Sequence, residues 1–121
     1  KINIMDEDME KLEKVKRIIS KIDTVEVNKS WYNNIEAMNK GVSKGKGIKA
    51  LGELLGIKKE EIIAFGDNYN DLSMKDYAGT FVAMGNGEDY VKQQADYITD
   101  SNDLDGVAKG IKKLVLGEEE L

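Results

Sequence analysis

The stretch that decides the fold reads EIIAFGDNYND and occupies residues 61–71. It contains a nearly unbroken apolar run, Ile62 to Phe65, and then Gly66 and a cluster of acids and carboxamides. Such a run predicts a strand that is buried on both faces, as strands in parallel sheets are. The sequence therefore predicts a parallel α/β sheet with polar side chains at the carboxyl end of one strand.

The segments around this stretch alternate between predicted helices and strands. A helix is expected from Lys44, with Ser43 as its N-cap, Gly56 at its end, and an apolar stripe. That stripe consists of Ile48, Leu51, Leu54 and Leu55. Strands are expected at 80–84 and 97–99, and helices at 72–77 and 88–95. This alternation indicates βαβ units and a three-layer, Rossmann-like sheet.

The sequence near the C-terminus predicts one more helix, and the βαβ pattern predicts three neighbouring strands. The last helix would carry apolar side chains at helical spacing, namely Leu104, Val107, Ile111 and Leu114. Phe65, Val82 and Ile98 are expected on adjacent parallel strands.

Residues 1–40 differ in texture from the rest, with fewer glycines and more charge. They predict a strand at 2–5, an amphipathic helix after it, and strands at 22–27 and 31–38. We interpret 1–40 as part of a separate α+β subdomain and 41–121 as part of the main domain.

Composition excludes several classes of protein. The 121 residues suffice for one ordinary domain, and the net charge of −5 argues against a nucleic-acid binder. No apolar run is long enough to span a bilayer. The chain has no histidine and no cysteine, which rules out a Ser-His-Asp triad, a histidine-ligated zinc site and disulfides. The cytoplasm is the default compartment, although absence of cysteine is compatible with either a reducing or an oxidising one.

The acidic loop at 67–71 carries the best candidate chemistry. Mg²⁺ prefers oxygen ligands and usually takes one or two carboxylates together with water and phosphate. Asp67, fixed at a strand end, suits that role, and a carboxamide three residues later could contact a phosphate oxygen. The alternative is a turn rich in Asn and Asp that merely caps the next helix.

Lys44 is a candidate phosphate-binding residue because it follows the N-cap of a predicted helix. The alternative is a solvated lysine, one of several in this part of the chain.

Together these motifs resemble the C-terminal part of the Cof-type phosphatases, a capped branch of the haloacid dehalogenase superfamily. The resemblance covers residues 41–116, and residues 1–40 resemble, more weakly, the end of the cap domain. The matching motifs are VSKG (42–45), IIAFGDNYNDLSM (62–74), VAMGN (82–86), ADYIT (95–99) and DGVA (105–108).

The resemblance implies a role for each residue. Lys44 would bind phosphate, Asp67 would bind Mg²⁺, and Asn70 would contact phosphate. Asn68 would be a secondary metal contact through its backbone, and Asp71 would orient Lys44 or the loop instead of binding the metal directly. If these roles hold, the Lys44 ammonium should lie within about 8 Å of the Asp67 or Asp71 carboxylate, a reach set by one bridging water or phosphate oxygen.

The family's nucleophile motif, D-x-D-G-[ST], has no good match in the chain. Its first Asp forms an aspartyl-phosphate and its second acts as general acid and base. Asp6-Glu7-Asp8 follows an apolar strand, but Met9-Glu10 stands where Gly-Thr is expected. These acids also fit a helix start, which is the interpretation we prefer.

The prediction is therefore a C-terminal fragment of a Mg²⁺-dependent phosphatase that acts on a small phosphorylated metabolite such as a sugar phosphate. Alone it should be inactive or nearly so. Phosphomutase chemistry in the same superfamily is one alternative, and a non-catalytic phosphate- or metal-binding or assembly module is another. An exposed sheet edge could also support self-association.

Overall fold

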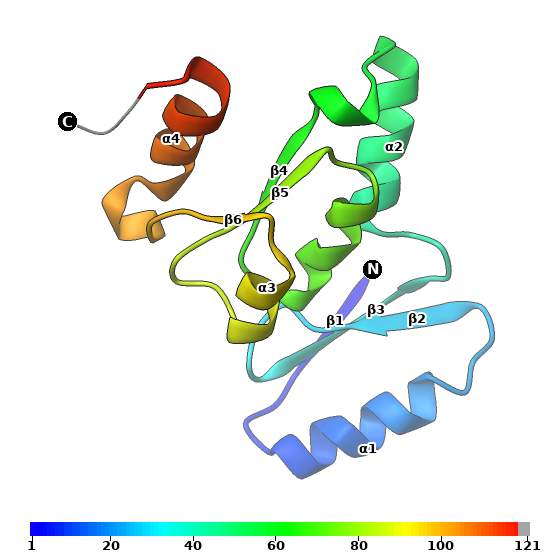
Figure 1. Ribbon diagram of the computed structural model, residues 1–121. Helices are drawn as coiled ribbons and strands as arrows, with labels where there is room; N and C mark the ends of the chain where they lie inside the picture. The colour runs from blue at the N-terminus through cyan, green and yellow to red at the C-terminus, as the bar shows by residue number, and fades with distance from the viewer. Residues whose placement is uncertain (119–121) are drawn as a thin grey trace.

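A computed structural model describes residues 1–118, so the last three residues of the predicted main-domain segment, 119–121, lie outside the described part. The described residues form two separate three-stranded sheets, one from residues before 40 and one from residues after 60. Figure 1 shows the first sheet between helix α1 and the rest of the chain. No helix within residues 1–118 combines the length and apolarity needed to cross a membrane.

The N-terminal sheet is antiparallel and has the order β1-β3-β2. Its elements are β1 (Ile2–Met5), α1 (Met9–Ile19), β2 (Val25–Asn28) and β3 (Asn34–Asn39). β2 and β3 begin three residues later than predicted, because residues 20–24 form turns and residues 29–33 form a loop. One face carries a row of polar partners across all three strands, Asn3, Glu36 and Asn28. The alternate positions of the strands, whose side chains point to the other face, carry apolar residues such as the paired Ile4 and Ile35.

The C-terminal sheet is parallel, which confirms the predicted fold class. It has the order β4-β5-β6, with Phe65 opposite Val82 and Ile98 opposite Ala83. Its strands are β4 (Ile63–Gly66), β5 (Thr80–Ala83) and β6 (Tyr97–Ile98). Its helices are α2 (Lys44–Leu55), α3 (Asp89–Gln94) and α4 (Gly106–Ile111), with 3₁₀ helices η1 (Lys59–Glu61), η2 (Tyr69–Asp76) and η3 (Asn102–Leu104) and a π-helical turn η4 (Lys112–Leu116).

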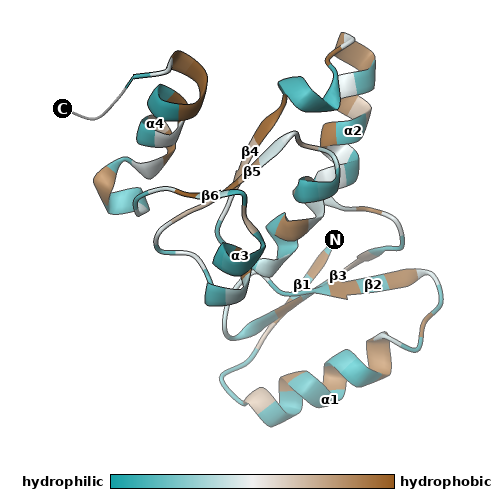
Figure 2. Ribbon diagram, in the orientation of Figure 1, coloured by the Kyte–Doolittle hydropathy of each residue, from teal (hydrophilic) through white to brown (hydrophobic). Residues whose placement is uncertain are grey.

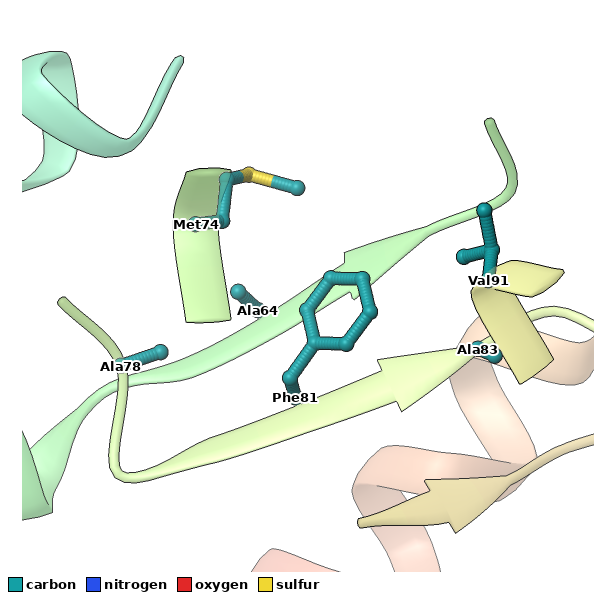
Figure 3. Packing of buried hydrophobic residues seen from close by; sticks show 6 residues of the cluster. All are labelled: Ala64, Met74, Ala78, Phe81, Ala83 and Val91. Atoms are coloured by element: carbon teal, nitrogen blue, oxygen red, sulfur yellow. The ribbon is translucent and has the colours of Figure 1, made fainter. Parts of the chain in front are cut away.

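Helices cover both faces of this sheet. On one face Ala64, Phe81 and Ala83 pack in a buried cluster with Met74 of η2 and Val91 of α3, as Figure 3 shows. On the other face α4 lies so close to Phe65 that a Cβ placed on Gly110 would come within 2.6 Å of the ring. The partial sheet therefore has the predicted three-layer arrangement.

The apolar residues of two predicted helices differ from expectation in their burial or in the helix that carries them. Leu51, Leu54 and Leu55 of α2 remain exposed, because no element within residues 1–118 covers that side of the helix. The predicted last helix is broken, since Asp105 takes the left-handed conformation (φ 56°) and separates Leu104 from α4. Figure 2 shows hydrophobic residues on the turn that follows α4, where Leu114 is exposed.

Candidate active site

The acidic loop follows β4 directly, at the carboxyl end of the parallel sheet. β4 ends at Gly66, and η2 begins at Tyr69 with Asn68 as its N-cap. A Cβ on Gly66 would come within 2.5 Å of the Asp71 Cβ, so glycine lets Asp71 fold back against the end of the strand. The Asp71 Oδ2 accepts hydrogen bonds from the backbone N–H groups of Asp67 (2.9 Å) and Asn68 (3.1 Å). Asp71 therefore fixes the shape of the loop.

Lys44 lies at the first position of α2, after the N-cap Ser43, whose hydroxyl accepts from the Lys46 N–H. The start of α2 packs against η2, where the Gly45 N–H donates to the Ser73 hydroxyl at 3.0 Å. This packing brings the Lys44 Nζ into direct contact with the Asp71 Oδ1. The predicted convergence of Lys44 with the acidic loop is thus confirmed, although the two residues are 27 positions apart.

The pKa values of the two carboxylates of the loop, Asp71 and Asp67, are shifted in opposite directions. Burial alone would raise the pKa of Asp71, but the Lys44 ammonium and the two backbone N–H groups hold it below the ordinary value. Burial raises the pKa of Asp67, and the neighbouring Asp71 carboxylate raises it further. In residues 1–118 no cation contacts Asp67 directly, because Lys44 is paired with Asp71. Asp67 is therefore a partly exposed carboxylate whose negative charge is poorly compensated, since the Lys44 ammonium lowers its pKa by less than burial and Asp71 raise it.

This arrangement fits a hard cation, since such an ion would supply the charge that Asp67 lacks. However, no cluster of three or more acidic side chains within residues 1–118 is placed to hold a metal ion. The described chain thus offers one suitable carboxylate rather than a complete metal site.

The two carboxamides of the loop are placed differently. Asn68 is buried, and its Oδ1 accepts from the Tyr69 N–H while its Nδ2 donates to the Ser30 carbonyl. Asn70 is half-buried and lines a cavity of about 460 Å³ between β2 and η2. The predicted metal contact of Asn68 and phosphate contact of Asn70 remain predictions.

The acids at 6–8 lie directly before helix α1, in agreement with the interpretation preferred from the sequence. The Asp8 carboxylate caps α1 by accepting from the Glu10 and Lys11 N–H groups. Asp6 accepts from the Asp8 N–H and pairs with the Lys11 ammonium at 2.8 Å.

Sequence reasoning missed Glu36, a buried carboxylate on the central strand β3. It accepts from the Ser30 hydroxyl and pairs with the Lys1 ammonium, both at 2.8 Å. Burial would raise the pKa of Glu36, but Lys1, Ser30 and the more distant Lys44 lower it overall. A charged residue between the apolar positions Ile35 and Ala37 was the available signal.

Asp67→Asn is expected to stabilise the chain at neutral pH. The raised pKa means that the folded state holds the Asp67 proton more readily than the unfolded state, so folding is disfavoured once the carboxyl ionises. Asparagine removes that charge, and the free energy of unfolding at pH 7 should rise by less than about 1 kcal/mol, because solvent screens a partly exposed group. The gain should vanish below the ordinary pKa of 3.8.

Urea unfolding at pH 7 and pH 3 checks this, with the exposed Asp23→Asn as the matched control. A loss of stability at pH 7, or a gain of equal size at both pH values, would show that Asp67 carries no uncompensated charge.

Comparisons with known proteins agree on one family. Residues 1–111 match the haloacid dehalogenase-like hydrolase family. The chain is 42% identical over 114 residues to the 5-amino-6-(5-phospho-D-ribitylamino)uracil phosphatase YcsE of Bacillus subtilis, covering 94% of this chain and 43% of that protein. It is 43% identical over 82 residues to the pyridoxal phosphate phosphatase YbhA of Escherichia coli, covering 68% of this chain and 30% of that protein.

A solved structure is similar over the same region. A haloacid dehalogenase-like hydrolase from B. subtilis superposes with a TM-score of 0.88 at 36% identity, covering 93% of this chain and 40% of that structure. The chain therefore spans less than half the length of each of these three proteins.

Proposed function

The chain belongs to the haloacid dehalogenase-like hydrolases, and we propose that it supplies the metal- and phosphate-binding half of a phosphatase site. The nucleophile would come from a segment that these 121 residues do not contain; a polypeptide with both parts is called the extended polypeptide. The observation that carries the proposal is the contact between Lys44 and Asp71 beside the poorly compensated carboxylate of Asp67.

Each side chain would act on the charge of the phosphoryl group. Lys44, about half exposed and held by Asp71, would place its ammonium against the phosphoryl oxygens. Asn70 would donate a hydrogen bond to the same oxygens. Asp67, with the backbone of Asn68 as a secondary contact, would hold Mg²⁺, which when bound supplies positive charge to those oxygens. Positioning and charge stabilisation of this kind are the main protein contributions to phosphoryl transfer.

The substrate would be a small phosphorylated metabolite, such as a sugar phosphate. YcsE and YbhA are, by their names, phosphatases of small phosphorylated molecules. Residues 1–40 would be the end of a cap domain, and their polar row, Asn3, Glu36 and Asn28, would lie on the side of the leaving group.

The nucleophile segment would pair with the free edge of β4. In the described sheet β4 has a neighbour on one side only, and Asp67 follows its last residue. A parallel strand on that edge would end beside Asp67, which is where a nucleophile is needed. Leu51, Leu54 and Leu55 of α2 are exposed and available for the same association.

The same uncovered surfaces also favour a second candidate function, a non-catalytic assembly module that self-associates through the β4 edge. Such a module would bind phosphate or metal but would release no phosphate from an ester, even in the extended polypeptide.

Mg²⁺ should bind the 121-residue chain only weakly, because the chain offers Asp67 without the carboxylates of the nucleophile motif. Calorimetry on the chain, Asp67→Ala and the remote control Asp23→Ala tests this. We expect a weak binding heat that Asp67→Ala abolishes and Asp23→Ala retains. Tight binding that survives Asp67→Ala would refute the assignment of the metal to this residue.

A further inference from the structure

Buried polar side chains gather on one path through the molecule. Among the described residues they are Asn33, Asn34, Glu36, Asn68, Asp71 and Thr99. All but Thr99 lie in residues 33–36 or 67–71. Buried polar groups need hydrogen-bond partners, so their arrangement shows which parts of the chain must stay together.

On the N-terminal side, the network folds the loop between β2 and β3. The Asn34 Oδ1 accepts from the N–H groups of Ser30 (3.1 Å) and Trp31 (2.8 Å). The Asn34 Nδ2 donates to the Ser30 hydroxyl, and that hydroxyl donates to Glu36. Loop 29–33 is thereby tied to the central strand β3.

One side chain carries the network across to the acidic loop. The Asn68 Nδ2 donates to the Ser30 carbonyl at 3.0 Å. Within residues 1–118 it is the one hydrogen bond that joins a residue before Gly41 to a residue after Val42. The Asn68 N–H donates to Asp71, which contacts Lys44. The path from Glu36 to Lys44 is therefore continuous.

We propose that Asn68 is a positioning residue whose carboxamide fixes loop 29–33, and with it the N-terminal sheet, over the loop that holds Asp67 and Asp71. The contact itself is independent of any chemistry, whereas its consequence rests on the proposed function. If the N-terminal sheet faces the leaving group, Asn68 sets the distance between that sheet and the phosphoryl site. The Asn68 Oδ1 caps η2 at the same time, so one carboxamide orders both loops.

The variant Asn68→Ser distinguishes the capping of η2 from the contact with Ser30. Serine is a good N-cap and retains an acceptor for the Tyr69 N–H, but it has no amide to reach Ser30. Asn86→Ser is the matched control, because Asn86 is exposed and its Oδ1 accepts from the Asn102 N–H instead of joining its loop to loop 29–33. Trp31, the single tryptophan, follows Ser30 and reports on loop 29–33 by its fluorescence.

Amide hydrogen exchange and Trp31 emission, both measured on the 121-residue chain, test the contact. The Ser30 and Trp31 amides keep their bonds to Asn34, but loop 29–33 loses the bond to the Ser30 carbonyl and should open more readily. With Asn68→Ser we therefore expect both amides to exchange about 5-fold faster, which corresponds to the free energy of one hydrogen bond, and the Trp31 emission to shift. Exchange in β5 should not change. Unchanged exchange at Ser30 and Trp31, a uniform increase throughout the chain, or an equal effect of Asn86→Ser would overturn the inference.

Kinetics in the extended polypeptide test the positioning role. Asn68→Ser should lower kcat/KM for phosphate monoesters about 5-fold, while Asn86→Ser leaves it unchanged. Faster exchange with unaltered kinetics would overturn the positioning role while the proposed function stands. An extended polypeptide without any turnover would instead refute the proposed function, and exchange would then decide whether Asn68 fixes the loop.

Discussion

Lys44→Ala is expected to reduce the turnover of a phosphate monoester by the extended polypeptide roughly 10²-fold, the usual effect of removing one charge contact to the transition state. The structure places the Lys44 ammonium at the strand end that carries Asp67, with Asp71 holding it there. The decrease should appear in kcat, because the charge on the phosphoryl oxygens that Lys44 meets is redistributed in the transition state.

Lys49→Ala is the matched control for this prediction. Lys49 lies on the same helix, is exposed, and makes one long contact with Glu53 at 3.9 Å. Its replacement should leave turnover within about 2-fold, since exposed ion pairs contribute little. If Lys44→Ala and Lys49→Ala behave alike, Lys44 is a solvated lysine and its assigned role is wrong. Circular dichroism should show both variants folded, because Lys44→Ala also leaves the buried Asp71 unpaired.

Gly45→Ala is expected to lower the free energy of unfolding by about 3 kcal/mol, at the upper end of the usual cost of overpacking. A Cβ on Gly45 would lie 1.9 Å from the Ser73 carbonyl oxygen and 2.9 Å from the Tyr77 ring. The obstacle is backbone, which cannot swing aside, so α2 must move away from η2. That movement would separate Lys44 from Asp71 as well.

Gly47→Ala, two residues further along the same helix, is expected to raise the free energy of unfolding instead of lowering it. A Cβ there would meet nothing within 4 Å. Alanine in a helix interior should therefore stabilise the chain by about 0.5–1 kcal/mol. Urea unfolding of the two variants measures the difference. Similar stabilities for Gly45→Ala and Gly47→Ala would mean that α2 does not pack against η2 as described.

The parallel sheet could be predicted because two of its strands, β4 and β5, lie in apolar runs that end at Gly-Asp and Gly-Asn. The apolar runs before Asp67 and before Gly85 indicate burial on both faces of the strand. This signal can be read from the local sequence without knowing which other elements pack nearby. The exposure of Leu51, Leu54 and Leu55 could not be predicted in this way. Helical periodicity identifies an apolar face, but whether another element covers that face depends on parts of the fold that local sequence does not specify.

The site was predictable in part. The convergence of Lys44 with the acidic loop followed from the resemblance and from the rule that ligands bind at strand ends. The path through Glu36, Ser30 and Asn68 was not predictable, because it joins side chains from both sheets. The side chain of Asn68 gave no sequence signal for a contact 38 residues away. Such contacts become visible only once the two sheets are placed together.

The most direct test of the half-site account is a comparison of phosphate release by the 121-residue chain and by the extended polypeptide. Both would be assayed on p-nitrophenyl phosphate with and without Mg²⁺, with Asp67→Asn in each. The account predicts Mg²⁺-dependent turnover by the extended polypeptide, a severe loss with Asp67→Asn, and only background release by the chain alone. Turnover by the 121-residue chain that survives Asp67→Asn but is lost with Asp6→Ala would contradict it, since the acids at the start of α1 would then be the reactive groups.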